Sequence, residues 1–290
     1  QGVATLKHVA EARERGLPLE EIPGLVVNKQ GKQIRTASRS RVDNLDVFPP
    51  PDRRKIEHYA PKYYQGWVRP VSLVQASTGS HYPGTVGAPA EESRLVREVE
   101  RVAAEMVELE TGICLADDDA IDEPARIARL CALLKESNFK QPIYLCTRAE
   151  AIAEHFEIIE DLADLGLVAV ALALDGTENG GPSPTQVKAI DILHSNEVAI
   201  SGEFKVFPDF DVEEIRKLWD YSRELGVEFP LFSTQTPFPG TPLFQEHRHE
   251  LRTPDWELFD RVHTVLSTRL SLRQFYSELA KLYERAYGLG

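Results

Sequence analysis

The sequence predicts an α/β fold, a partial TIM-like (β/α)6 barrel between an N-terminal linker segment and a C-terminal helical extension. From Val71 onward, short apolar runs alternate with longer segments whose apolar residues recur at helical spacing. The runs begin roughly 30 residues apart, the usual size of a βαβ step. They are continuously apolar, as expected of parallel strands covered by helices. Six units fit an open barrel better than a closed eight-unit one, and a doubly wound sheet is the structural alternative.

The predicted elements follow one another in strand–helix order. Strands are expected at residues 71–75, 113–116, 142–146, 167–174, 198–207 and 229–234. Helices are expected at residues 90–110, 123–137, 149–165, 184–196 and 212–225. The first of these helices carries Val99, Val102 and Met106 on one face, which predicts that this face packs on the sheet.

The ends of the chain differ from its middle and suggest three segments. Residues 1–70 begin with a helix and a hairpin that turns near Gly31, followed by a stiff connector at Pro49–Pro51. Residues 71–246 form the barrel. Residues 247–290 carry a helix near 272–287 whose aromatic stripe we expect to serve packing. The same apolar and aromatic segment is a candidate for closing the barrel mouth.

Composition excludes several classes of protein. The net charge of −13 disfavours a general nucleic-acid binder, which needs a basic face. No apolar run approaches the ~20 residues that span a bilayer, and the start shows no signal-peptide pattern. The cysteines (Cys114, Cys131, Cys146) are odd in number and widely spaced, which indicates buried thiols in a reducing compartment. We therefore expect a cytoplasmic protein.

Several short motifs at predicted strand ends carry a family resemblance. The most informative is Phe232–Phe244, FSTQTPFPGTPLF, an apolar strand that runs into a rigid proline-rich turn. The others are LEEIPGLVV at 19–27, DVFPP at 46–50, LADDD at 115–119, TRA at 147–149 and DG at 175–176. Together these motifs resemble the catalytic-domain portion of the cobalamin-dependent (B12-binding) radical S-adenosylmethionine (SAM) family.

The resemblance implies a SAM site at the carboxyl ends of the strands. Asp117 and Asp118 would bind the SAM amino group, Arg148 its carboxylate and Asp175 a ribose hydroxyl. Gln235 and Thr236 would present backbone groups to adenine, with Phe238 stacking nearby. Gly79 would mark the loop that binds an iron–sulfur cluster.

Each of these residues also has a structural interpretation. Asp117–Asp119 would form a solvated loop with a helix cap, with Asp122 as a competing cap. Arg148 would form an ion pair with a neighbouring acid, Asp175 would sit in a plain turn, and residues 235–238 would merely cap the strand. Glu203 and Lys205 share a face of their strand, which is the barrel interior in one interpretation and an exposed edge in the other. His81 is a candidate ligand that is more simply a solvent-facing loop residue.

The resemblance fails after the first strand. The family carries CxxxCxxC there, and its three thiolates hold a 4Fe–4S cluster whose fourth iron binds SAM. Residues 76–84 read ASTGSHYPG, without cysteine; Ser80, Gly84 and Gly87 stand at the ungapped cysteine positions. In one interpretation the protein is a cluster-less relative. In the other, which we favour, the natural protein carries a further loop between Gly79 and Ser80, and a normal peptide separation of ~3.8 Å between their Cα atoms would contradict it.

The favoured interpretation implies an enzyme. A reduced cluster would cleave SAM to a 5′-deoxyadenosyl radical, and cobalamin, held by a domain before Gln1, would support methyl transfer or rearrangement on a small, hydrophobic substrate. An electron donor such as flavodoxin or ferredoxin would be the partner. The alternatives are a cluster-less SAM- or partner-binding subunit and a metal-dependent barrel enzyme that uses the Asp117–Asp119 carboxylates.

Overall fold

The computed structural model describes residues 2–40, 42–79, 94–174 and 183–288. Packing divides the chain into two compact units, one of residues 1–55 with 95–97 and the other of residues 56–94 with 98–290. The predicted segment boundaries after residues 70 and 246 stay expectations. Each unit is described separately below.

The smaller unit contains the predicted helix and hairpin. Its regular elements are α1 (Gly2–Arg15), the 3₁₀ helices Leu19–Glu21 and Leu45–Val47, β1 (Val26–Lys29), β2 (Lys32–Arg35) and β5 (Leu95–Val96). β1 and β2 pair antiparallel, and Gln30 and Gly31 both take positive φ at the turn. The Asn28 side chain accepts a hydrogen bond from the Gly31 amide (3.0 Å), which fixes the hairpin register.

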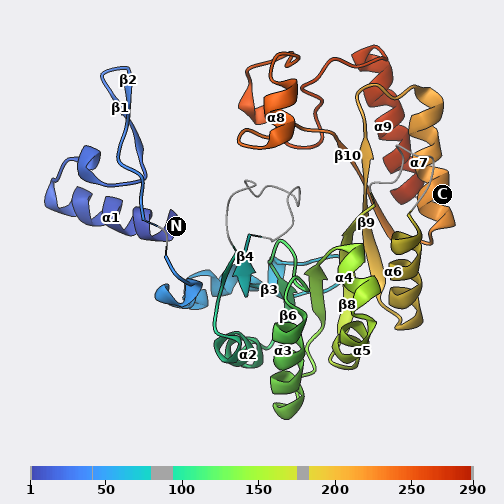
Figure 1. Cartoon of the computed structure of the whole chain (residues 1–290), viewed down its shortest axis with the longest axis horizontal. Coiled ribbons are helices and arrows are strands. Elements are labelled where there is room, and N and C mark those ends of the chain that lie inside the picture. Colours follow the sequence, from blue (N-terminus) through green and yellow to red (C-terminus); the bar gives the residue numbers. More distant parts are fainter. Residues whose placement is uncertain (1, 41, 80–93, 175–182, 289–290) are drawn as a thin grey trace. The chain divides into compact units, whose positions relative to one another are not determined.

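The larger unit is built on one parallel sheet (Figure 1). Its strands are β3 (Val71–Val74), β6 (Gly112–Leu115), β7 (Ile143–Cys146), β8 (Leu167–Ala173), β9 (Ala199–Val206) and β10 (Phe229–Thr234). The order within this sheet, β10-β9-β8-β7-β6-β3, follows the chain without reversal, and β3 and β10 are its edge strands. A doubly wound sheet reverses its order at a switch point. The predicted open, six-unit parallel architecture is therefore confirmed.

Helices pack on one face of this sheet and create its core. They are α2 (Val99–Glu108), α3 (Pro124–Glu136), α4 (Ala149–Glu154), α5 (Phe156–Asp164), α6 (Pro184–Ser195), α7 (Val212–Glu224) and α9 (Leu272–Tyr287). Ile113, Ile143, Val170, Ile200 and Phe232, one from each of five strands, belong to the buried cluster that these helices complete. On β9 every second residue is buried and the intervening ones are partly exposed, so the opposite face of the sheet stays accessible.

Two helix predictions need correction. The helix expected at 90–110 begins at Val99, because Leu95–Val96 is extended as β5 and Glu98 has the extended backbone of a helix N-cap. The helix expected at 149–165 is two helices, α4 and α5, which meet at His155 with φ −128° and ψ 53°. The Lys188 ammonium of α6 donates to the Ala153 carbonyl (2.8 Å), which satisfies a backbone acceptor at this break.

The C-terminal helix lies against the sheet edge. Its aromatic stripe serves packing, as predicted, because Phe275 and Leu282 are buried in the core. The Tyr283 hydroxyl donates to the Phe232 carbonyl (2.9 Å) and accepts from the Phe232 amide (3.0 Å). The Tyr287 hydroxyl donates to the Pro230 carbonyl (2.8 Å). α9 therefore covers backbone groups of the edge strand β10, and closure of the barrel mouth by the C-terminal segment stays a prediction.

Phe275→Ala tests this packing. Phe275 is fully buried, so truncation should lower the free energy of unfolding by about 3–5 kcal/mol through lost burial and a residual cavity. Phe156→Ala is the matched control, because Phe156 is 49% exposed and should cost under about 1 kcal/mol. Urea denaturation followed by circular dichroism measures both; equal losses would contradict the packing of α9.

Candidate functional site

Three consecutive carboxylates, Asp117–Asp119, follow β6 at the carboxyl edge of the sheet. Asp117 is buried and turns toward the loop after β3. Its Oδ1 accepts from the amides of Ala76 (2.8 Å) and Ser77 (3.0 Å), and its Oδ2 accepts from the Ser77 hydroxyl (2.8 Å). Burial raises the pKa of Asp117 above its usual range, although the Ser77 and Ala76 donors oppose the rise. This carboxylate therefore clamps the base of the neighbouring loop.

Asp118 binds the same loop two residues beyond Ser77. Its Oδ2 accepts from the amide of Gly79 (2.7 Å), a buried glycine with φ +79°. That backbone conformation favours glycine over residues with a Cβ. Gly79 and Asp118, two of the predicted cofactor-binding residues, thus lie together at this edge.

Asp119 links β6 to the end of β7. It accepts from the Thr147 hydroxyl (2.6 Å) and from Arg148 Nε (2.5 Å). The Arg148 guanidinium also lies 3.6 Å from the Glu150 carboxylate. Arg148 therefore makes the ion pair that the structural interpretation anticipated, and the pair holds the guanidinium at the rim of the sheet.

A second buried ion pair supports the same corner. Arg94 and Asp122 approach to 2.5 Å, and both side chains are almost completely excluded from solvent. Arg94 also donates to the Asp119 carbonyl at 3.5 Å. Asp122, expected as a helix cap, is instead an ion-pair partner, while α3 begins at Pro124 without a side-chain cap.

The predicted adenine-facing residues follow β10. The Gln235 amide donates to the Val206 carbonyl (3.2 Å), which extends the pairing of β10 with β9. The Thr236 hydroxyl donates to the Thr234 carbonyl (3.2 Å), and Thr241 donates to the Phe238 carbonyl (2.6 Å). Phe238 itself is half-buried. These contacts fix the turn at the carboxyl end of the last strand, where ligands of α/β folds bind.

Glu203 and Lys205 share the accessible face of β9, in agreement with the barrel-interior interpretation, since β9 is an internal strand. Glu203 accepts a hydrogen bond from the Ser233 hydroxyl and forms an ion pair with Arg261. Arg261 was missed by sequence reasoning. It lies beyond the barrel units, and no periodic pattern marks it.

Thiols and a tyrosine line the central part of the same face. Burial raises the pKa of Cys114 to about 11, and the charge of Asp117 adds to the rise. Burial likewise raises the pKa of Cys146 to about 11, assisted by Asp119. Burial also raises the pKa of Tyr144, and the neighbouring Ser201 and Gln65 oppose that rise. Both thiols are therefore protonated at neutral pH.

The cysteines do not fit a 4Fe–4S cluster. Cys131 packs in the core among the helices, whereas Cys114 and Cys146 belong to strands of the sheet and are partly accessible. The described residues hold no group of three or more His, Cys, Asp or Glu side chains placed for a metal ion. A cluster with an open iron needs three converging thiolates. The metal-dependent alternative based on Asp117–Asp119 likewise finds no converging ligands among the described residues.

Some predicted residues lie outside the described ranges. They are Asp175 and Gly176, together with Ser80, His81, Gly84 and Gly87. The Gly79–Ser80 separation that bears on a missing loop involves Ser80 and so stays untested. In the part of the chain that is described, no helix is both long enough and apolar enough to span a membrane.

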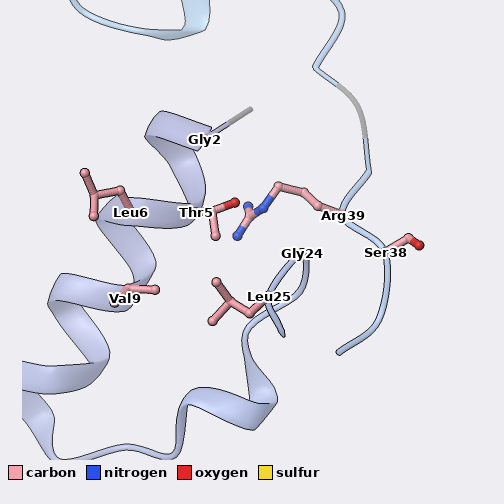
Figure 2. Close-up of a pocket in the computed structure, with 8 residues that line it drawn as sticks. All are labelled: Gly2, Thr5, Leu6, Val9, Gly24, Leu25, Ser38 and Arg39. Atoms are coloured by element: carbon pink, nitrogen blue, oxygen red, sulfur yellow. The ribbon is translucent and has the colours of Figure 1, made fainter. Parts of the chain in front are cut away.

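A shallow pocket of about 560 Å³ lies on the smaller unit (Figure 2). The side chain of Arg39 extends between Thr5 and Gly24 there, and its Nη2 lies 2.9 Å from His8 Nδ1. None of the predicted site residues lines this pocket.

Comparison with known proteins agrees with the fold. The chain is 25% identical over 299 residues to the hopanoid C-3 methylase of Methylococcus capsulatus, covering 99% of this chain and 57% of the relative. It is 23% identical over 305 residues to an uncharacterized methyltransferase of Pyrococcus horikoshii, covering 99% of this chain and 65% of that protein. The chain thus spans about three fifths of the length of these curated relatives. No protein-family model matches it.

A solved structure shares the fold of this chain. The apo form of OxsB, a cobalamin-dependent S-adenosylmethionine radical enzyme, superposes with a TM-score of 0.61 at 15% identity. The match covers 99% of this chain and 44% of OxsB. At this identity the likeness establishes the fold, a parallel barrel-like sheet with covering helices.

The variant Asp117→Asn tests the environment of the Asp117 carboxyl group, because that environment makes the stability depend on pH. Because burial raises the folded-state pKa of Asp117 above its ordinary value of 3.8, the folded state binds this proton more tightly than the unfolded state. The stability that the group contributes is complete below about pH 3.8 and is lost as the pH rises through the folded-state pKa. The free energy of unfolding of the wild type, minus that of Asp117→Asn, should therefore fall as pH rises above 4. Urea titrations from pH 3.5 to 7 measure it; a pH-independent difference would show that the Ser77 and Ala76 donors cancel the effect of burial on this pKa.

Asp119→Ala tests the ion pair at the end of β7. Removal leaves the partly buried Arg148 guanidinium without its buried carboxylate and should lower the free energy of unfolding by about 3 kcal/mol. Asp161→Ala, which breaks the exposed Lys135–Asp161 pair, is the matched control and should leave stability unchanged. Chemical denaturation of the two variants compares them. A loss no larger than that of the control would show that the buried pair does not secure the rim.

Proposed function

We propose that this chain is the barrel portion of a SAM-dependent methyl-transferring enzyme with cobalamin-dependent radical SAM architecture. Two curated relatives aligned over 99% of the chain are named a methylase and a methyltransferase. OxsB, a cobalamin-dependent S-adenosylmethionine radical enzyme, shares the fold. The observation that carries the proposal is the rim: Asp118 with Gly79, Arg148, and the turn after β10 all follow carboxyl ends of strands of one sheet.

The rim residues suit a zwitterionic nucleoside such as SAM. Arg148 would hold the carboxylate of SAM through its fork of donors. Gln235 and Thr236 would offer backbone groups to the adenine edge, and Phe238 would stack on the base. Asp118 would shape the opposite side of the site. Asp117 would do so indirectly, through the loop that Asp117 holds. Asp175 remains a predicted ribose contact. The protein's task would be to orient SAM and a small-molecule substrate and to exclude water.

Radical chemistry needs a cluster that these cysteines do not fit. A 4Fe–4S cluster would supply the electron that cleaves SAM, so no such step is assigned to the residues of this chain. The candidate that we favour is a natural protein with a cysteine loop between Gly79 and Ser80. Such an enzyme would use a flavodoxin- or ferredoxin-like electron donor and cobalamin from a domain before Gln1. The scattered cysteines favour the second candidate, a cluster-less SAM- or partner-binding subunit.

Peptide mapping across residues 70–100 of the natural protein separates these candidates first. A cysteine-containing peptide between Gly79 and Ser80 would support the radical enzyme, and anaerobic iron–sulfide reconstitution should then produce the visible absorbance of a cluster and SAM-dependent 5′-deoxyadenosine. A direct Gly79–Ser80 bond with no cluster would leave the binding subunit.

Phe238→Ala tests SAM binding in either case. Loss of a stacking partner should raise the Kd for SAM about tenfold, since aromatic stacking on a base contributes ~1–3 kcal/mol. Phe156→Ala, on the exposed side of α5, should leave the Kd unchanged. Isothermal titration calorimetry measures both variants. Absence of SAM binding to the wild type would overturn the proposed function.

A further inference from the structure

The pocket of the smaller unit has a wall built from paired backbone. The Thr36 amide donates to the Leu25 carbonyl (3.0 Å), and the Leu25 amide donates to the Thr36 hydroxyl (2.9 Å). The Gly24 amide donates to the Ala37 carbonyl (2.7 Å). These bonds join the segment that precedes Arg39 to the segment that precedes β1. The backbone that carries Arg39 is therefore fixed at the pocket.

Arg39 is a cation without a carboxylate partner in the described part of the chain. Its side chain extends from its own segment toward α1, among the residues that line the pocket (Figure 2). Its Nη2 donates to His8 Nδ1 (2.9 Å), and this is its one hydrogen bond to a described residue. Its Nε is enclosed and meets no acceptor there. Since a guanidinium has five N–H donors, most of those on Arg39 are left for another group.

This arrangement leaves a partly buried positive charge uncompensated. Burial removes water that would stabilise the guanidinium, so a buried charge is ordinarily paired with an opposite one. His8 does not supply that charge, because a histidine nitrogen that accepts a hydrogen bond does so through a lone pair and carries no negative charge. A carboxylate or phosphate would supply it, and a guanidinium binds either group through parallel N–H bonds.

The rest of the lining is uncharged and largely apolar. Leu6 and Val9 line the pocket from α1, and Leu25 lines it from the segment before β1. Among the described residues that line it, Arg39 alone is charged. The volume of about 560 Å³ falls in the range of ~300–1,000 Å³ that is usual for small-molecule sites, which combine apolar walls with a few polar groups.

The sequence around the pocket is basic, whereas the whole chain is acidic. Residues 1–55 contain eleven Lys and Arg side chains against seven Asp and Glu, although the chain has a net charge of −13. This excess of positive charge would attract an anion to the smaller unit. The apolar walls add a second requirement, because an inorganic anion would leave them in contact with water.

We propose that this pocket binds a small acid with an apolar body. The carboxylate or phosphate group of the ligand binds the Arg39 guanidinium, and its apolar part packs against Leu6, Val9 and Leu25. All of these residues belong to the smaller unit. The site is therefore separate from the rim of the sheet and does not rest on the proposed function.

The test compares probes that share one alkyl chain and differ in the head group: octanoate, octyl phosphate and 1-octanol. Equilibrium dialysis against the full chain measures each Kd. The wild type should bind one or both anions about tenfold more tightly than 1-octanol, which is the gain of a charge-assisted contact. Arg39→Gln should abolish this preference. Arg39→Lys should keep part of it, because it retains the charge but not the fork of donors.

Two matched controls separate the pocket from its surroundings. Arg35→Gln removes an exposed charge from β2, outside the pocket lining, and should leave the preference unchanged. Val9→Asn should weaken the binding of all three probes severalfold, whereas the same substitution at Val3, an exposed residue of α1 outside the lining, should not. Thermal unfolding followed by circular dichroism confirms that each variant is folded.

Three results would overturn the proposal. The first is a wild type that binds 1-octanol as tightly as both anions. The second is an equal loss of preference in Arg39→Gln and Arg35→Gln, which would indicate attraction by the net charge of the unit rather than a site. The third is sedimentation of the chain with phosphatidylcholine vesicles only when they contain phosphatidate, if Arg39→Gln abolishes it. That result would assign the anion to a lipid surface instead of a small acid.

Discussion

Three consecutive carboxylates at the end of one strand hold the carboxyl rim of the sheet together. Asp117 binds the loop base at Ala76 and Ser77, Asp118 binds the Gly79 amide, and Asp119 binds the end of β7 through Arg148. These contacts join the ends of β3, β6 and β7, whose loops would otherwise be free to separate. The candidate SAM site depends on this arrangement, because loops position ligands only when the scaffold fixes their bases.

The two faces of the sheet carry different kinds of side chain. The face under the helices is closed and apolar, and it buries residues such as Val170 and Phe232. The opposite face carries ionisable and hydroxyl groups, among them Glu203, Lys205 and Tyr144. The C-terminal segment contacts both: Tyr283 covers the backbone of edge strand β10, and Arg261 forms an ion pair with Glu203 on the accessible face.

The similarity to methyl-transferring relatives concerns architecture more than reactive groups. The fold accords with that of OxsB, and the sequence is similar to that of the hopanoid C-3 methylase. Of the thiols in this chain, Cys131 is in the core, and Cys114 and Cys146 are protonated and lie on two neighbouring strands. The cysteines of this chain therefore do not form the three-thiolate group that a 4Fe–4S cluster with an open iron needs. The fold of this chain therefore does not by itself establish its reaction.

The order of strands and helices, the parallel sheet and the strand ends that form the rim can all be predicted from the amino-acid sequence. Those features follow from hydrophobic periodicity and turn residues, which are local properties. The partners of the polar side chains become known only from the tertiary structure. Asp117 became a loop clamp rather than an open ligand, the helix expected from residue 90 began at Val99, and Arg261 joined Glu203 across 58 residues of chain. Such pairings depend on which segments meet in space, and no local pattern encodes them.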